Sequence, residues 1–423
     1  MLIPCKYDKK YLMLNKNYLL PSEALKILIN ALKKVDPPFE RCKIEEGFGR
    51  ITATDIASPE DLPPFARSTV DGYAVSSADT FGASETSPAY ITVRHEVKMG
   101  VAPDFTVRSM ESAIIPTGGM LPEGTDAVVM LEHAQFIPPD MIEIIKSVAP
   151  AENVIQRGED IKLGEILIHK GSKLRAQDIG ALAGIGIIEI DVFKKPLVSV
   201  ISTGDEIISP EMPVKQGQIR DINSYTLTGL IKDAGGIALR KGIIRDEYNA
   251  IKGIIEESVN DSNMILLSGG TSAGAQDMVA SIINNIGSPG VLFHGLSLKP
   301  GKPMIGGIIG NKPVLGLPGH PVAVAVCFDL FIRPLIEALA GLRQDKYTYK
   351  TIRAKMTKNV ASAAGREDHI RVYIEEKDGE IYAHPVLGKS GLISVLVRAQ
   401  GSVVIPHSKF GLDAGDEVTV RLF

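Results

Sequence analysis

Residues 265–277 read ILLSGGTSAGAQD, a short apolar run followed by a glycine-rich loop that ends in a carboxylate. An ordinary turn needs one or two glycines, whereas this stretch combines three glycines with small hydroxyl side chains. Glycine readily adopts positive φ and leaves backbone N–H groups uncovered. The stretch therefore predicts a buried strand, a loop that a ligand can approach closely, and the start of a helix.

The same order of strand and helix repeats on both sides of this stretch. Strands that alternate with helices predict a mainly parallel sheet covered by helices on both faces. Residues 195–346 are therefore expected to form one α/β domain. The expected strands include PLVSVIS (196–202), IALRKGII (237–244) and KPVLGL (312–317), and the expected helices include 223–236, 247–259 and 320–341.

The rest of the 423-residue chain has a different composition. Turn-rich segments separate short strands over residues 59–150, which predicts a β-rich insert domain. The chain before and after this insert, 16–58 and 151–194, is expected to form one discontinuous linking domain, with a helix capped by Ser22. Residues 347–423 are expected to be a β domain with a hairpin turn at Asp378.

The overall charge and the cysteines limit the class of protein. The formal net charge is −4, with 46 basic and 50 acidic side chains, which argues against a nucleic-acid or membrane partner. The three cysteines lie far apart, which suits a reducing compartment and offers no zinc or disulfide framework. The longest apolar run, from Pro321, is interrupted by Asp329. We therefore expect a cytoplasmic protein.

Three glycine-containing loops follow predicted strands, at 202–207, 268–277 and 316–321. Ligands of open α/β sheets bind outside the carboxyl ends of the strands. A glycine-rich loop before a helix N-terminus is an anion site, usually for phosphate. A carboxylate at this point, Asp277, suits a divalent metal that bridges it to phosphate.

A simpler interpretation of Asp277 stays open, because acidic residues are favoured at the start of any helix. For an isolated aspartate this second interpretation is the commoner one. Other acids at predicted strand ends or helix starts favour the metal interpretation. They are Asp205, Glu206, Asp221 and Asp246.

The segment LKPGKP (298–303) adds Lys299 and Lys302, which suggest an oxyanion or phosphate site, although two solvated lysines in a turn would look the same. The spacing is not that of a P-loop, because Pro303 stands where Ser or Thr would bind Mg²⁺. His320 has no partner at metal-ligand spacing and is expected to be a local hydrogen-bonding group.

Taken together, these segments resemble the molybdopterin molybdenumtransferase family, the MoeA and gephyrin E-domain proteins. The resemblance extends from about residue 16 to residue 423, and its landmarks occur in the order of the family. They are PPFARSTVDGYAV, PTGGMLPEGTDAVV, QRGEDI, STGDEI, SGGTSAGAQD, LKPGKP, GLPGHPVAVAV and GKSGLISVLVRAQG.

The resemblance implies a four-domain protomer with a molybdopterin-binding α/β domain and a C-terminal β-barrel-like domain, assembled as a homodimer. It implies a reaction in which adenylylated molybdopterin and molybdate give molybdenum cofactor and AMP, helped by Mg²⁺ or another divalent cation. Molybdopterin adenylyltransferase is the upstream partner that it implies.

The resemblance also implies roles for individual residues. Asp277, Asp246 and Glu206 match acids of the family's cleft, with metal-binding and catalytic roles, and Lys299 and Lys302 match catalytic lysines. Asp71 and Thr117 of the insert would reach the cleft of the partner subunit. The residues expected to bind substrate are Gly269, Gly270, Thr271, Ser272, Pro318, Pro321, Asp71, Thr117, Arg366, Ser390 and Ser394.

Three positions depart from a common family pattern. His320 replaces an asparagine, Ala323 stands where some members have serine, and Ala66–Arg67 differ in the segment that keeps Asp71. These changes leave open a variant that handles tungstate instead of molybdate. A non-catalytic molybdopterin-binding scaffold is a second alternative. A CinA-type enzyme of the same fold is a third, and it would lack the insert.

Overall fold

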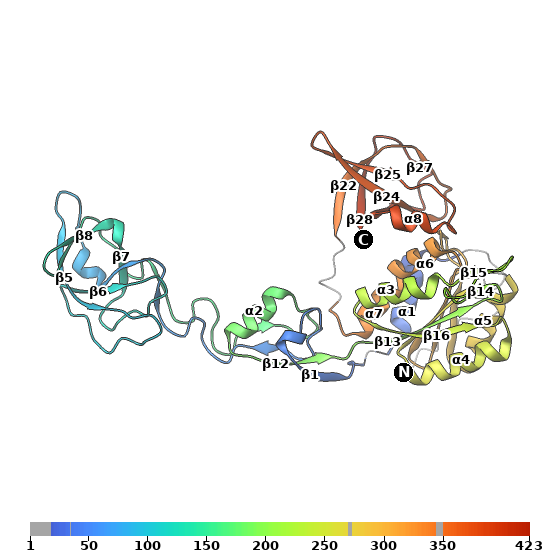
Figure 1. The fold of residues 1–423 in the computed structure, drawn as a ribbon, viewed down its shortest axis with the longest axis horizontal. Coiled ribbons are helices and arrows are strands. Elements are labelled where there is room, and N and C mark those ends of the chain that lie inside the picture. Colours follow the sequence, from blue (N-terminus) through green and yellow to red (C-terminus); the bar gives the residue numbers. More distant parts are fainter. Residues whose placement is uncertain (1–17, 34, 270–272, 344–349) are drawn as a thin grey trace, which may run out of the picture. The chain divides into compact units, whose positions relative to one another are not determined.

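The computed structural model describes residues 18–33, 35–269, 273–343 and 350–423. The chain divides into two compact units, which Figure 1 draws in sequence colours. The first unit comprises residues up to 40, 49–53 and 192–423, and the second comprises 41–48 and 54–191. In these described ranges, no helix is both long and apolar enough to cross a membrane.

The first unit is built on a six-stranded sheet with the order β16-β13-β17-β21-β20-β18. The first four strands are parallel, β20 runs antiparallel to β21, and β18 runs antiparallel to β20, which confirms the expected mainly parallel sheet. Strand β20, whose sequence carries two glycines, was not anticipated. The bounds are β13 (Leu197–Thr203), β16 (Ile237–Ile244), β17 (Met264–Gly269), β18 (Pro289–His294), β20 (Ile305–Ile309) and β21 (Lys312–Leu317).

Strand β17 shows why the sheet is covered on both faces. Its side chains alternate between two cores, because successive residues of a strand point to opposite faces. Met264 and Leu266 belong to the core that packs against α1, α3 and the helices after β21. Ile265 and Leu267 belong to the core that packs against α4 and α5.

The helices agree closely with the expected ones. The long helix expected over 320–341 is a continuous helical run of α6, a π-helical segment and α7. The expected cap Ser22 is wrong, because α1 begins at Pro21 and Glu23 accepts the Leu20 N–H at 2.9 Å instead. The bounds are α1 (Pro21–Ala31), α3 (Asn223–Asp233), α4 (Tyr248–Asp261), α5 (Ala273–Ile286), α6 (Pro321–Cys327), the π segment (Phe328–Ile332) and α7 (Arg333–Leu339).

The C-terminal part of this unit is a closed sheet, as the expected barrel-like domain requires. Its order is β24-β25-β22-β28-β26, and β26 pairs back onto β24. The hairpin turn lies at Asp378 and Gly379, both at positive φ. The bounds are β22 (Thr351–Met356), β24 (Glu367–Lys377), β25 (Glu380–Pro385), β26 (Gly401–Ile405) and β28 (Glu417–Leu422), with helix α8 (Ile393–Arg398) and the small pair β23 (Val360–Ala361) and β27 (Gly411–Leu412).

The second unit contains the β-rich insert, a six-stranded sheet with the order β7-β4-β6-β5-β9-β8. Helix α2 (Ala176–Gly184), short 3-10 helices and short strands such as β11 (Ile166–Ile168) also belong to this part of the chain. The bounds of the sheet are β4 (Gly72–Val75), β5 (Ala89–Glu96), β6 (Glu111–Ile115), β7 (Ala127–Met130), β8 (Ala134–Ile137) and β9 (Met141–Ile144).

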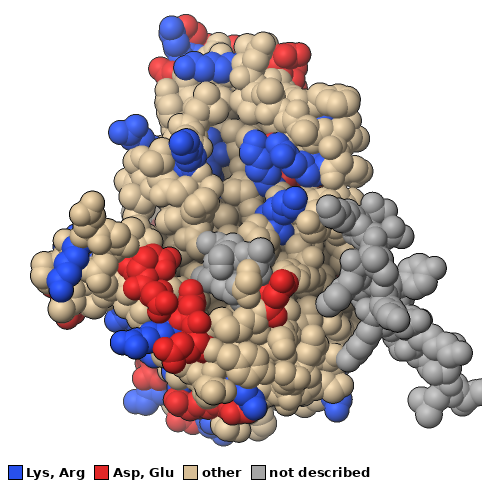
Figure 2. Space-filling view, turned by 90° about the vertical axis from the view of Figure 1, so that its right-hand side faces the viewer, with Lys and Arg blue, Asp and Glu red and all other residues tan. Residues whose placement is uncertain are grey.

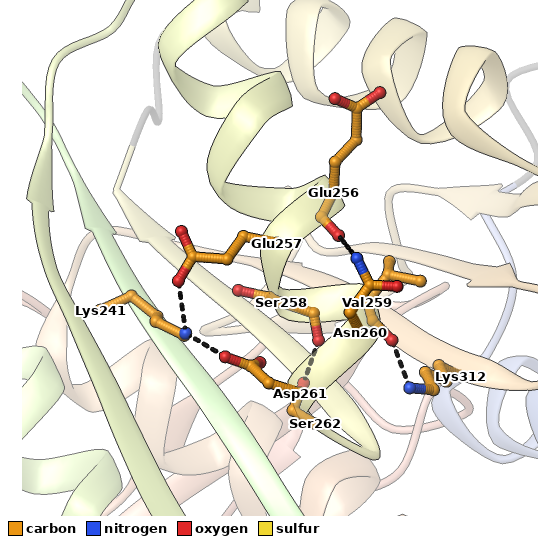
Figure 3. Close-up of polar contacts among 9 residues, drawn as sticks. All are labelled: Lys241, Glu256, Glu257, Ser258, Val259, Asn260, Asp261, Ser262 and Lys312. Carbon is orange, nitrogen blue, oxygen red and sulfur yellow. Dashed lines mark hydrogen bonds and ion pairs between the residues drawn. The ribbon is translucent and has the colours of Figure 1, made fainter.

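A polar cluster fastens the last turn of α4 to the sheet (Figure 3). Lys241 of β16 donates to Glu257 at 2.9 Å and to Asp261, and these two carboxylates raise the pKa of the lysine. Lys312, the first residue of β21, donates to the Val259 carbonyl. The cluster reaches the amino end of β21, away from the edge where the parallel strands end.

Candidate functional site

The parallel strands end side by side at one edge of the sheet. Thr203, the last residue of β13, pairs with Ile244 at the end of β16 and with Gly269 at the end of β17. Ser268 of β17 pairs with Leu317 at the end of β21. The loops that carry Asp246, Glu206, the 268–277 segment and Pro318 therefore leave the sheet at the same edge.

Gly269 makes the closest backbone approach at this edge. Its φ is +124°, and a Cβ built there would lie 1.8 Å from the carbonyl oxygen of Thr203. No side chain fits that space, so the glycine is required by the packing of two neighbouring strands. Gly270, Thr271 and Ser272, which were expected to bind substrate, lie outside the described residues.

Asp246 lies in a concentration of negative charge. Burial raises its pKa, and the nearby carboxylates of Asp205 and Glu206 raise it further, against a smaller effect of a hydrogen bond from Thr203. Its Oδ1 atom is buried and has no hydrogen-bond partner among the described residues. Figure 2 shows a face on which a group of acidic side chains lies below several lysine and arginine side chains.

Asp277 is the fifth residue of α5 and is exposed. It lies about one turn into the helix, as the sequence indicated. However, no group of three His, Cys, Asp or Glu side chains in the described ranges is close enough to hold a metal ion. The expected set of Asp277, Asp246 and Glu206 is therefore not gathered around one point in this structure.

Asp221, one of the acids noted in the sequence, has a structural role. Its carboxylate accepts hydrogen bonds from the hydroxyls of Ser202, at 2.8 Å, and Ser224, at 2.6 Å. It also accepts the Ser224 backbone N–H at 3.1 Å, in the first turn of α3. This buried carboxylate fastens the start of α3 to β13.

Asn223 connects two of the three loops, and the sequence analysis missed it. Its Nδ2 donates to Ser268 Oγ and to the Gly319 carbonyl, both at 2.8 Å. Its Oδ1 is buried without a hydrogen-bond donor among the described residues. The available signal was a polar residue, followed directly by Ser224, at the start of the helix expected over 223–236.

The two lysines lie in different surroundings. Lys299 Nζ is 3.6 Å from Asp368 Oδ2, and this carboxylate also accepts from Arg366 Nε at 2.8 Å and Nη2 at 3.3 Å. Lys302 Nζ lies 4.7 Å from the ring centroid of Tyr18. Asp368, whose side chain is 1% exposed, thus holds two expected substrate-contacting residues together.

The arrangement depends on the pairing of a two-residue strand, β19 (Leu298–Lys299), with β24. In this register Lys299 lies opposite Asp368. Sequence reasoning missed Asp368 because the two residues are far apart along the chain and meet only through this pairing.

His320 joins the GLPGHP loop to the C-terminal domain. Its Nδ1 lies 2.8 Å from Ser390 Oγ, and the Val322 N–H donates to the Ser390 carbonyl at 3.2 Å. His320 is a hydrogen-bonding group, as expected, but its partner Ser390 is 70 positions away in the sequence and is not local. Pro318 and Pro321 are buried beside it, whereas Ser394 is an exposed residue of α8.

In the second unit, the structure brings Asp71 and Thr117 together. Thr117 donates its N–H, at 2.7 Å, and its Oγ1, at 3.0 Å, to Asp71 Oδ1. These two hydrogen bonds lower the pKa of Asp71, which stays exposed.

Comparison with known proteins gives the family. Three family models match in order: the MoeA N-terminal region (domains I and II) over residues 20–186, a probable molybdopterin binding domain over 199–338, and the MoeA C-terminal region (domain IV) over 353–423. A putative molybdopterin biosynthesis protein of Methanocaldococcus jannaschii is 35% identical over 96% of this chain and 98% of its own length. The chain belongs to the MoeA family.

Other members of the MoeA family support the same conclusion. The molybdopterin molybdenumtransferase of Haemophilus influenzae is 32% identical, over 91% of this chain and 94% of its own length. The crystal structure of the MoeA protein of Pyrococcus horikoshii OT3 is similar, with a TM-score of 0.83 and 31% identity. That match covers 96% of this chain and all of the solved one, so the multidomain MoeA fold is shared.

Proposed function

We propose that this chain is a molybdopterin molybdenumtransferase. It would insert molybdenum from molybdate into adenylylated molybdopterin, releasing AMP and forming molybdenum cofactor. The observation that carries the proposal is the common edge of the sheet where β16, β13, β17 and β21 end. Acidic residues lie on one side of this edge, and beside them the backbone of Gly269 closely approaches that of Thr203. Membership of the MoeA family agrees with it.

The phosphate side of the reaction is assigned to the loop at 268–277 and the start of α5. Backbone N–H groups at a helix N-terminus bind anions, and α5 begins within this segment, at Ala273. Asp277, Asp246 and Glu206 are assigned to adenylate cleavage. Pro318 and Pro321 shape the neighbouring loop.

The acidic residues fit a divalent cation, Mg²⁺ or another. Asp246 carries a buried oxygen without a hydrogen-bond partner among the described residues, and burial, followed by the nearby carboxylates of Asp205 and Glu206, raises its pKa. We assign the cation to Asp246, Glu206 and Asp277, although this structure does not gather the three carboxylates around one point. When bound, the cation supplies charge neutralisation at phosphoryl oxygens.

The oxyanion side is assigned to Lys299, Lys302 and Arg366, together with Ser390 and Ser394. Lysine and arginine donors stabilise an oxyanion, and Asp368 fixes the position of two of them. Molybdate is the substrate proposed for this group.

The remaining assignments follow the family resemblance. We propose a cytoplasmic homodimer in which Asp71 and Thr117 of one subunit complete the site of the other. Molybdopterin adenylyltransferase would supply the substrate. The proposed domains are 16–58 with 151–194, 59–150, 195–346 and 347–423.

The test is AMP release from adenylylated molybdopterin with Mg²⁺, measured with and without molybdate, with molybdenum cofactor assayed in parallel. Molybdate-dependent AMP release with cofactor formed is expected. Tight pterin binding without AMP release would replace the proposal with a scaffold function. A parallel assay with tungstate in place of molybdate tests which oxyanion the protein uses. Equal cofactor yield and equal affinity for molybdate and tungstate would argue against a tungstate-specific variant.

A further inference from the structure

A cavity of about 680 Å³ lies between the α/β part of the first unit and its C-terminal β domain. Its walls come from α3, the helical run after β21, α8 and the end of β28. The volume falls within the range of pockets that bind small molecules, about 300–1,000 Å³. The proposed reaction assigns no residue of this cavity a role.

The titratable side chains of the cavity carry an excess of positive charge. Asp233 is paired with Arg333, whose Nη2 lies 2.8 Å from its Oδ2. Asp329 lies 3.8 Å from Arg371 and 4.0 Å from Arg421, which are ion-pair distances. The lining contains four basic side chains, Arg333, Lys350, Arg371 and Arg421, against the two acids Asp233 and Asp329.

Arg371 is the unusual member of this set. Its side chain is 4% exposed, yet Nε and Nη2 have no hydrogen-bond partner among the described residues. These two nitrogens form one edge of the guanidinium group, and Arg366 uses the same edge to hold Asp368 in a bidentate pair. Asp329 faces the remaining nitrogen, Nη1. The Nε and Nη2 edge of Arg371, whose geometry matches an oxyanion, therefore has no acceptor among the described residues.

A buried guanidinium without acceptors is costly, because its N–H groups lose water and gain nothing in return. Burial lowers the pKa of Arg371 to about 10, and Arg421 contributes to this lowering against the effect of Asp329. A bound anion would restore the missing hydrogen bonds. The ring of Phe423 stacks 4.3 Å from the guanidinium carbon and is 60% exposed, so it can move aside without breaking the core.

We propose that this cavity binds a small molecule through a dianionic phosphate group, held by the Nε and Nη2 edge of Arg371 with Lys350 and Arg421 nearby. A phosphate suits the site better than a carboxylate, because it brings about two negative charges to the two surplus positive ones. The ligand would contact both the α/β part and the β domain and would therefore stabilise their association. This inference is independent of the proposed transferase reaction.

The test uses the absence of tryptophan from the whole sequence. A Phe423→Trp variant places a single tryptophan against Arg371, and inorganic phosphate is titrated while the emission of this tryptophan is recorded. Saturable quenching or a spectral shift is expected. Adding Arg371→Lys keeps the charge but removes the fork, and should weaken phosphate binding by on the order of 10-fold or more.

The matched control is Phe423→Trp with Arg240→Lys, because Arg240 also stacks on an aromatic ring, that of Tyr225, outside the cavity. It should bind phosphate as tightly as the parent reporter. Lys350→Gln, at an exposed position, provides a second variant if Arg371→Lys does not fold. The proposal would be overturned if phosphate gave no saturable signal, or if Arg371→Lys or Lys350→Gln bound phosphate as tightly as the parent reporter. Binding of acetate as tight as that of phosphate would also overturn it.

Discussion

At the scale of single residues, Asp277 is the most direct test of the proposed chemistry. Asp277→Asn should leave the fold intact, because the side chain is exposed near the start of α5. It should slow AMP release by at least ~10-fold, the low end for loss of a group that holds or positions a metal. The measurement is the rate of AMP release at saturating Mg²⁺.

Asp261→Asn is the matched control, since Asp261 is also an exposed helix aspartate of the α/β part but belongs to the cluster in Figure 3. It should leave the rate of AMP release unchanged. A folded Asp277→Asn protein with full turnover would remove Asp277 from the mechanism.

The raised pKa of Asp246 predicts that the stability of the protein depends on pH. Its folded-state pKa is raised above the ordinary value of 3.8, so the folded protein binds the proton more tightly than the unfolded chain does. The ionised group therefore costs stability at neutral pH, and this cost disappears as the pH falls through the raised pKa toward 3.8. Asp246→Asn should melt at a higher temperature than the parent at pH 7.

The melting temperatures should be compared in EDTA, to exclude divalent cations, from neutral pH down toward pH 4. The difference should narrow as the pH falls. A difference that is constant or grows at acidic pH would show that the raised pKa is not its cause.

Asp368 is predicted to be a positioning residue for molybdate. Asp368→Asn removes the charge that holds Arg366 and Lys299, so the KM for molybdate should rise by roughly 10-fold, the usual cost of losing a charge-assisted pair. At saturating molybdate the kcat should change much less. This split separates positioning from a loss of folded protein, which would lower kcat alone.

Asp378→Asn is the control for that comparison. Asp378 lies in an exposed hairpin turn of the same β domain at φ 55°, a conformation that asparagine tolerates well. Its kinetics should match those of the parent. An unchanged KM in Asp368→Asn would show that Asp368 only stabilises the domain.

At the scale of elements, the end of β17 depends on a glycine. Gly269→Ala would place its Cβ 1.8 Å from the Thr203 carbonyl oxygen at φ +124°, so β13 and β17 could not keep their register. We expect a loss of stability of at least about 1–3 kcal/mol, the cost of one strained backbone position. Thermal unfolding of the purified protein measures it.

Gly253→Ala is the matched control, because Gly253 lies inside α4 with nothing within 4 Å of its added Cβ. This change should raise stability by about 0.5–1 kcal/mol through helix propensity. Similar melting temperatures for the two variants would refute the proposed role of Gly269 in strand packing.

The elements themselves were largely predictable. The alternation of buried strands and amphipathic helices over residues 195–346 has a local cause, the period of apolar residues, and the structure agrees with it. Two details were not predictable. Strand β20 was missed because its sequence is rich in glycine. The cap of α1 was missed because Pro21 already occupies the first helical position and Glu23 accepts the capping hydrogen bond.

At the scale of the whole molecule, the proposed homodimer predicts complementation between subunits. If Asp71 of one subunit completes the site that contains Asp277 of the other, each heterodimer of Asp71→Ala and Asp277→Asn chains has one intact site. Random reassortment of equal amounts should then restore about a quarter of the parent AMP release, as expected for a two-fold symmetric dimer. Each variant alone should show only the reduced rate of its own substitution.

The reassortment is measured after mixing the two variants under mild dissociating conditions, with the mass of the assembly recorded by light scattering. An active mixture would assign the two residues to different subunits. An inactive mixture of proven heterodimers would place both residues of a site in the same subunit, and a monomeric mass would refute the dimer itself.

The amino-acid sequence determined the order of the elements, the loops at the strand ends and the membership of the MoeA family, because these depend on local periodicity and on short motifs. Only the tertiary structure decided which distant residues meet. Lys299 reaches Asp368 through the pairing of β19 with β24, and His320 reaches Ser390 across 70 positions. Such contacts have no local signature, since the free energy that forms them comes from strand register and packing.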